Sequence, residues 1–263
     1  MASPRLRQRV NVLGLGTLLA LVGLWELLIG SGTLEYQFLP APSAIAHSGA
    51  DLVGSGDMLA NVLHTVKVTL LGWLMASLLG IGLGLLLGLS RTAWRYSMAS
   101  IEVMRAIPPV SLVPVALLVF GFSIRMELTI IVFVSAWPVL VNTIDGVRGV
   151  RTELLDVARM LRMPRLTRIR KVVLPAAMPS IVVGLRLGLS LSLVLAVVAE
   201  MIGNPDGLGN ALVSAQQALQ PEQMFAYVFA IGLLGIGLNA AVGYASARLM
   251  PSLAAGAPPR RKR

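Results

Sequence analysis

The side chains able to perform acid–base, nucleophilic or metal chemistry are few in this sequence, and none forms a catalytic pattern. The 263 residues include no cysteine, which excludes disulfides, thiol catalysis and cysteine-ligated zinc or iron–sulfur sites. Only His47 and His64 supply imidazoles, so a metal site built from several histidines is not expected. The sequence has no phosphate loop, GxSxG elbow or HExxH motif. We therefore expect no enzyme activity, and no cofactor or metal bound by this chain.

Charged residues inside apolar segments are the remaining candidates for chemistry. Glu102 and Arg105 are spaced i, i+3 and can pair on one helical face, which lowers the cost of immersing either charge. Arg186 and Glu200 are 14 residues apart in the sequence. That separation is about 21 Å along a helix axis, so they cannot pair within one helix. Glu200 precedes a GNPDGLG turn, where it either serves as a gate, makes a structural hydrogen bond or is solvated at the interface.

The elements that position these residues are membrane-spanning helices. The chain is 56% hydrophobic and 13% charged, with a mean hydropathy of +0.80. Windows of about 20 apolar residues can cross a bilayer core of roughly 30 Å. The first apolar run exceeds a secretory signal core, so we expect it to remain as a span. The sequence predicts an all-α integral membrane fold with six spans, at residues 11–30, 63–89, 98–121, 126–147, 181–202 and 226–249.

The basic residues indicate the orientation of these spans. Of 22 Lys and Arg residues, 18 lie near the two ends of the chain (Arg248 included), in the 90–97 turn or in the 148–171 loop, which alone carries eight. The loops 31–62 and 203–225 carry none. Because cytoplasmic loops are rich in Lys and Arg, this alternation predicts that both termini are cytoplasmic. The net charge of +10 therefore reflects membrane orientation, and nucleic acid is not an expected partner.

The same pattern predicts the domain organisation. Residues 1–10 form a basic cytoplasmic tail, 11–249 the transmembrane domain and 250–263 a second basic tail. Within the domain, residues 148–175 form a basic, partly helical cytoplasmic loop. Nothing about crossing a membrane requires such a loop, so we interpret it as a docking surface.

Two spans contain patterns that affect helix packing. Gly80, Gly84 and Gly88 lie on one helical face and allow close approach of a neighbouring helix, either within the chain or at a subunit interface. Three prolines in the third span, Pro108, Pro109 and Pro114, cannot all sit in a regular helix. A broken helix at membrane depth either lines a water-filled pathway or forms a static kink buried in protein.

The translocation path is less clearly marked than the docking loop. Asn142 follows the Trp137-Pro138 pair and can bond across helices. Other candidates come from the broken third span and from the fifth span. The residues that we expect to line the pathway or form a gate are Arg105, Pro108, Ser111, Asn142 and Glu200.

The basic loop resembles a cytoplasmic motif of bacterial ABC importer membrane subunits: EAA, three residues, G, nine residues, then I-x-LP. Here Asp156-Val157-Ala158 takes the EAA place and Val172-Val173-Leu174-Pro175 the last. The spacing matches throughout. Arg162, in the glycine place, is the one substantial departure.

Other segments resemble the permease subfamily for nitrate, taurine and aliphatic sulfonates. The similar pieces run in order from residue 25 to 249, and they include WE at 25–26, FLPAPSA at 38–44, RAIPPVSLVP at 105–114, LPAAMPSIVVGLR at 174–186 and AEM at 199–201. Each piece is weak alone, whereas the ordered set is specific.

The resemblance implies a multi-subunit importer in the bacterial inner membrane. Two copies of the chain would form the pore, and two ATPase subunits, which bind ATP and Mg²⁺, would dock beneath it. An external binding protein would deliver the solute. The loop at 153–164 would couple the pore to the ATPase, and the coupling residues implied are Glu153, Asp156, Val157, Ala158, Arg162, Pro164, Leu174 and Pro175.

Three points stay open from the sequence. The solute is undetermined, because the external binding protein of such systems supplies most of the selectivity. A self-sufficient channel or carrier, and a membrane scaffold for a cytoplasmic partner, are the rival classes. Because Arg disfavours a positive φ, we also hypothesise that the turn after the coupling helix shifts to Met163-Pro164 and that Arg162 contacts an acidic site on the ATPase.

Overall fold

The computed structural model of the chain describes residues 12–31, 36 and 38–249, and the regular structure in these ranges is entirely helical. The all-α prediction is therefore confirmed for the described residues. The two predicted basic tails, at 1–10 and 250–263, lie outside them.

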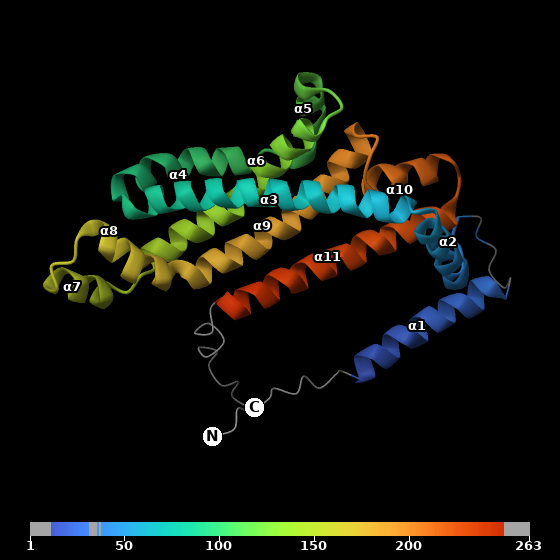
Figure 1. Cartoon of the computed structure of the whole chain (residues 1–263), viewed down its shortest axis with the longest axis horizontal. Coiled ribbons are helices and arrows are strands. Elements are labelled where there is room, and N and C mark those ends of the chain that lie inside the picture. Colours follow the sequence, from blue (N-terminus) through green and yellow to red (C-terminus); the bar gives the residue numbers. More distant parts are fainter. Residues whose placement is uncertain (1–11, 32–35, 37, 250–263) are drawn as a thin grey trace.

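Three long helices form the centre of the molecule: α3 (Asp57–Leu89), α6 (Ile124–Arg148) and α9 (Leu174–Gly203), which run side by side (Figure 1). Glycines on α3 permit this packing. A Cβ added at Gly84 would lie 2.6 Å from the Cβ of Thr143 on α6, and one at Gly80 would lie 2.7 Å from that of Val139. The predicted glycine face thus packs within the chain.

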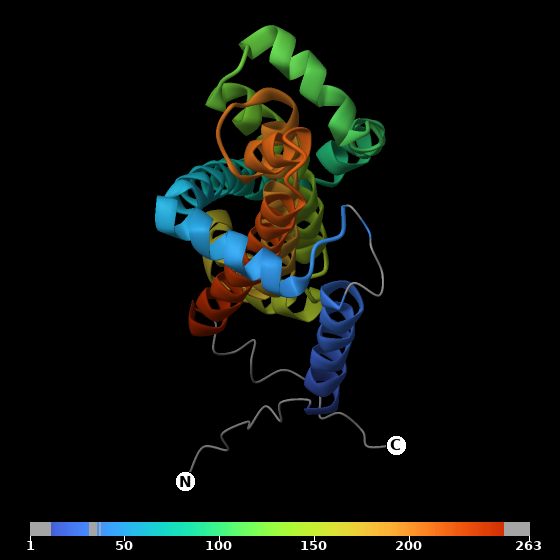
Figure 2. The ribbon, with the colours of Figure 1, turned by 90° about the vertical axis from the view of Figure 1, so that its right-hand side faces the viewer.

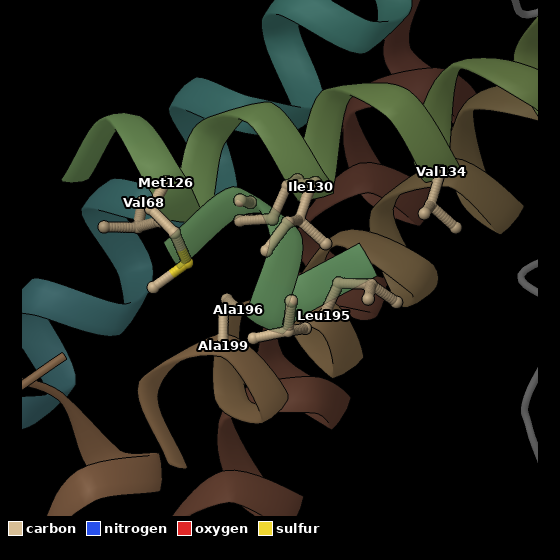
Figure 3. Packing of buried hydrophobic residues seen from close by; sticks show 10 residues of the cluster. Val68, Met126, Ile130, Val134, Leu195, Ala196 and Ala199 are labelled. Atoms are coloured by element: carbon tan, nitrogen blue, oxygen red, sulfur yellow. The ribbon is translucent and has the colours of Figure 1, made fainter. Parts of the chain in front are cut away.

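The largest set of buried apolar side chains among the described residues lies toward the end of the bundle that carries α5 (Figures 1 and 3). Val68 of α3, Met126 of α6 and Ala196 of α9 are buried there, with Val113 of α5. Since these side chains come from four helices, the core fixes how those helices sit against one another.

The predicted break in the third span is confirmed. Helix α4 (Arg91–Arg105) is followed by a 3-10 turn, η1 (Pro109–Ser111), and then by α5 (Leu112–Phe120), with a bend of 73° between the two parts. The start differs from the prediction, because α4 begins directly after α3. Ser90 is its N-cap, and its hydroxyl accepts a hydrogen bond from the Ala93 N–H at 3.2 Å.

Four further helices surround the bundle: α1 (Val12–Gly30), α2 (Pro42–Ser55), α10 (Leu208–Gln217) and α11 (Pro221–Leu249). The 31–62 and 203–225 segments, which carry no Lys or Arg, contain the short helices α2 and α10. Figures 1 and 2 show α1 standing apart from the bundle. It is attached through Glu26, whose carboxylate accepts hydrogen bonds from the Ser43 N–H (2.9 Å) and hydroxyl (2.8 Å) at the start of α2.

The number of spans is four or five among the described residues. Helix α3, helix α6, the continuous helix 165–203 and helix α11 are long and apolar enough to cross a membrane, and the bent pair α4–α5 would be a fifth. The described apolar part of α1, residues 16–30, is shorter. The structure therefore supports a multi-span membrane protein without establishing the predicted six.

The predicted loop 148–175 is mostly helical. It contains α7 (Thr152–Met160) and α8 (Arg165–Arg168), which continues through a π-helical turn, η2 (Ile169–Val173), into α9. The fifth span, predicted to start at residue 181, is therefore the far part of a longer helix. Pro175 has no N–H to donate to the preceding turn, and the wider π turn lies directly before it.

Candidate functional sites: the α7 turn and a buried carboxylate cluster

Helix α7 carries half of the expected coupling residues on one short amphipathic element. Ala158 is buried, with 1% of its surface exposed. Leu155 packs on the apolar cluster that includes Val147 and Val173. Leu174, from the second half of the predicted motif, packs on the same cluster. The spacing of the motif therefore reflects two segments that share one patch of core.

The opposite face of α7 is apolar and exposed. Leu154, Val157, Met160 and Leu161 are exposed by 45%, 54%, 82% and 63%. These residues lie next to basic side chains beyond the ends of the spans, and not along a span itself. Contiguous exposed apolar surface of this kind marks a site for a partner.

The two acidic coupling residues of α7 form ion pairs with neighbouring arginines. Asp156 pairs with Arg159 at 2.6 Å, and Glu153 with Arg151 at 3.5 Å. All four side chains are more than half exposed, so the pairs contribute little to stability. They leave both carboxylates at the surface of α7.

Helix α7 ends in a Schellman turn whose left-handed position is Arg162, with φ = 48°. The Arg162 N–H donates to the Arg159 carbonyl at 2.9 Å, and the Met163 N–H to the Ala158 carbonyl at 3.0 Å. The hypothesis that the turn shifts to Met163-Pro164 is therefore wrong. The turn lies at Arg162, in the glycine place, because both hydrogen bonds form only with a left-handed residue at that position. Pro164 is the N-cap of the next helix.

The residues expected along the pathway do not form one site within the chain. Arg105 pairs with Glu102 at 3.2 Å, as predicted, and the Ser111 hydroxyl donates to the Pro108 carbonyl at 2.7 Å. Among the described residues, Asn142 makes no hydrogen bond across helices. Its amide donates to the Pro138 carbonyl of its own helix at 2.8 Å, because that carbonyl lies one turn away.

Glu200 belongs to a separate, buried cluster that caps helix α10. Its side chain is completely buried, so it is not a solvated interfacial residue. Its Oε2 atom accepts hydrogen bonds from the Thr65 hydroxyl at 3.0 Å and from the Gly209 N–H at 2.9 Å. The Thr65 hydroxyl in turn accepts from the Leu208 N–H at 3.0 Å. A carboxylate at a helix N-terminus is favoured by the free N–H groups and the helix dipole.

Gly207 makes this cap possible. Its φ of 97° suits glycine, and a Cβ at this position would lie 2.3 Å from the Glu200 carboxyl carbon. The turn after α9 is thus shaped around the Glu200 side chain.

A second buried carboxylate, Glu127, was missed by the sequence reasoning. It is completely buried at the start of α6, accepts a hydrogen bond from the Asn204 amide and lies 3.5 Å from Nε2 of His64. The available signal was an ionisable residue within a predicted span, which is costly unless it is paired. Together with Glu200 it fastens the turn after α9 to helices α3 and α6.

These two sites suit different tasks. The α7 face can bind a partner and transmit its movement through the cluster around Val147. The carboxylate cluster can hold or release the turn at the other end of the bundle, since it joins three spans through few hydrogen bonds. No group of three or more potential metal ligands occurs in the described ranges.

Comparison with known proteins agrees with the fold. Residues 77–254 match the family model for the inner membrane component of binding-protein-dependent transport systems. The chain belongs to this family. It is accordingly a membrane-embedded ABC importer permease component, a transport protein.

Relatives narrow the class further. The chain is 32% identical to a Bacillus subtilis (strain 168) permease assigned to aliphatic sulfonate transport, over 82% of this chain and 78% of that one. It is 30% identical to a nitrate import permease of Leptolyngbya laminosa, over 88% of this chain and 85% of that one. These relatives confirm the predicted subfamily resemblance.

Solved structures support the fold. The inward-facing MetNI methionine ABC transporter matches with a TM-score of 0.62 at 18% identity, over 74% of this chain and 94% of that one. An amino acid ABC transporter with bound histidines matches with a TM-score of 0.61 at 18% identity, over 77% of this chain and 97% of that one. At this identity the likeness concerns the fold alone.

Proposed function

We propose that the chain is the transmembrane permease subunit of an ATP-driven importer and that two copies form the translocation pathway. Each copy would receive a small solute from an external binding protein. Each would be coupled through residues 153–164 to a separate ATPase subunit, which binds the ATP and Mg²⁺.

The exposed apolar face of α7 carries this proposal. Val157 and Met160 project from a helix whose other side is packed on the bundle through Leu155 and Ala158. A groove on the ATPase would cover this face. Movement of α7 would then pass into α6 and α9, which contribute Val147 and Ala177 to the same cluster.

Six spans with both termini in the cytoplasm are part of the proposal. The described apolar length of α1 is short for a span, but its exposed leucines, such as Leu18, Leu21 and Leu24, suit lipid or a second copy of the chain. The basic loop around α7 then lies in the cytoplasm, where the ATPase is. The membrane is accordingly the bacterial inner membrane.

For the solute we propose a small anion of the nitrate or sulfonate type, including taurine. The support is the naming of two relatives for sulfonate and nitrate transport. Deletion of the gene for this chain should abolish uptake of one such solute by the source organism. Re-expression of the chain should restore that uptake. Unchanged uptake of nitrate, taurine and alkanesulfonates would contradict this part.

Partner binding is tested by purifying the tagged chain from its native membrane in gentle detergent and identifying co-purifying proteins. We expect an ATPase with a phosphate loop. The double variant Val157→Glu, Met160→Glu should lose it, because it places charge on the docking face while leaving the buried side of α7 intact. A chain that is recovered alone, and that transports in liposomes without ATP, would indicate a carrier or channel instead.

Leu166→Glu provides the matched control. Leu166 is 65% exposed and lies in the same basic segment, but outside residues 153–164. The control should retain the ATPase. Equal loss in the control and in the α7 variant would assign the effect to added charge in general. Retention of the ATPase but no solute flux in any preparation would favour a scaffold.

A further inference from the structure

A cavity of about 700 Å³ lies beside α7, at the end of the bundle formed by the end of α3 and the end of α6. Segments from six elements (α3, α4, α6, α7, α8 and η2) line it, and its lining includes no carboxylate. It does include five arginines: Arg91, Arg148, Arg159, Arg165 and Arg168. Such a concentration of one charge calls for a physical explanation.

Within the described ranges, few of these guanidinium groups are neutralised by the protein. Arg159 pairs with Asp156, and Arg148 stacks on the Trp94 ring at 3.8 Å. The other three, Arg91, Arg165 and Arg168, have no carboxylate partner in the described part of the chain. Like charges that converge on one cavity repel one another, and a bound anion would reduce this repulsion.

Membrane orientation does not account for this convergence. The positive-inside bias depends on the number of Lys and Arg residues in a loop, and these could all point into open solvent. Arg170 and Lys171 lie in the same basic segment and are exposed, but they do not line the cavity, whereas the half-buried Arg168 and the exposed Arg91 and Arg165 do. Only some of the basic side chains in this segment therefore line the cavity.

The cavity also receives the N-terminus of a helix. Ser90, the N-cap of the 15-residue α4, lines the cavity next to Arg91. The positive end of the α4 dipole adds to the potential of the arginines, whereas the C-terminal ends of α3 and α6, which also line the cavity, oppose it. The arginines are therefore the main source of positive potential in the cavity. Guanidinium groups bind phosphate through paired N–H donors, and the volume falls in the range of small-ligand sites.

We propose that this cavity binds a phosphate-bearing anion, held by Arg91 on one side and by Arg165 and Arg168 on the other. The phosphate can come from a lipid headgroup, since the cavity lies where two spans end, or from a soluble diphosphate. In either case the anion joins the α4 N-terminus to the segment that follows α7. Occupancy thus stiffens the attachment of α7 to the bundle, independently of what the importer carries.

The test uses the full-length chain in nanodiscs of zwitterionic phosphatidylcholine, with inorganic pyrophosphate as the soluble probe and calorimetry as the readout. We expect saturable binding. The double variant Arg165→Gln, Arg168→Gln should weaken binding roughly tenfold or more, because it removes two charge-assisted contacts. The matched double variant Arg170→Gln, Lys171→Gln loses the same charge outside the cavity and should bind within about twofold of the wild-type chain.

A second variant and a second probe complete the design. Arg91→Gln changes the wall of the cavity formed by α4 and leaves α8 unchanged, and it should also weaken pyrophosphate binding. The unfolding temperature of each variant, measured without anion, checks that the variant is folded. In nanodiscs containing phosphatidylglycerol, native mass spectrometry measures lipid retained by the chain. Retention with the same dependence on the arginines supports the site and identifies the lipid as its ligand, whereas pyrophosphate binding alone identifies a soluble one. Absence of both, or equal loss in the two double variants, overturns the proposal.

Discussion

At the residue scale, the α7 turn shows how a side chain can occupy a place that favours glycine. Arg162 adopts φ = 48° because the bonds from its own N–H and from that of Met163 close the end of α7. A non-glycine residue in this region pays on the order of 1 kcal/mol or more. The turn therefore stores strain at the edge of the proposed docking face.

Arg162→Gly should relieve this strain and slow hydrogen exchange of the Met163 amide about fivefold, which corresponds to about 1 kcal/mol. Exchange measured by mass spectrometry on the 152–164 segment tests this. Arg162→Ala is the control, because alanine removes the long side chain but keeps the backbone cost. Equal exchange in the glycine and alanine variants would show that the backbone is not strained.

The cap of α10 supports a second prediction at this scale. Thr65→Val removes the hydroxyl that bonds both Glu200 and the Leu208 N–H, leaving buried polar groups unpaired. It should cost about 1–3 kcal/mol and lower the unfolding temperature. Thr69→Val, one turn further along α3, is matched in size and burial. The Thr69 hydroxyl has no hydrogen-bond partner within the described residues, so this control should be neutral or stabilising.

The interactions of single residues could be predicted where the interacting partner is close in the sequence. The Glu102–Arg105 pair follows from i, i+3 spacing alone. The partners of Glu200 do not, because Thr65 lies 135 residues away and only the packing of α3 against α9 brings them together. Glu127 was overlooked for the same reason, since its partner Asn204 lies 77 residues away in sequence.

At the element scale, the close approach of α3 and α6 depends on glycine. Gly84→Ala would place a methyl group 2.6 Å from the Thr143 Cβ and 2.9 Å from the Leu140 carbonyl oxygen. We expect a destabilisation of about 1–3 kcal/mol from overpacking, measured as a lower unfolding temperature in detergent.

Gly82→Ala is the control for this prediction. Gly82 lies on the same helix, and a Cβ there would meet nothing within 4 Å. Alanine should be tolerated, because it removes the entropic cost of a helical glycine. A Gly82→Ala variant as unstable as Gly84→Ala would mean that both faces of α3 are tightly packed, for example against a second copy.

Most of the elements could be predicted from composition and proline placement. The break between α4 and α5 follows from three prolines within seven residues. Helix starts were less accurate, since α4 begins at a Ser90 cap directly behind α3 and α9 continues from a π turn that apolar patterning does not reveal. Hydropathy indicates the length of the apolar part of a helix, whereas the capping residues determine where the helix begins.

At the scale of the whole molecule, the orientation of the chain in the membrane can be measured directly. The sequence has no cysteine, so single cysteines can be introduced without removing native ones. A membrane-impermeant maleimide added outside intact cells should label Ser55→Cys, at the exposed end of α2, but not Arg170→Cys, beside α8. Both should react after the cells are opened. Reversed labelling would contradict the proposed orientation and place α7 away from the ATPase.

The central claim, that α7 docks on an ATPase, is tested most directly by site-specific photo-cross-linking in the native membrane. A photoreactive amino acid at Met160, which is 82% exposed, should form an adduct with a phosphate-loop ATPase identified by mass spectrometry. The same probe at Leu118, 88% exposed on α5 at the far end of the bundle, should form no such adduct. An adduct at Met160 with lipid only, or with another copy of this chain only, would contradict the account.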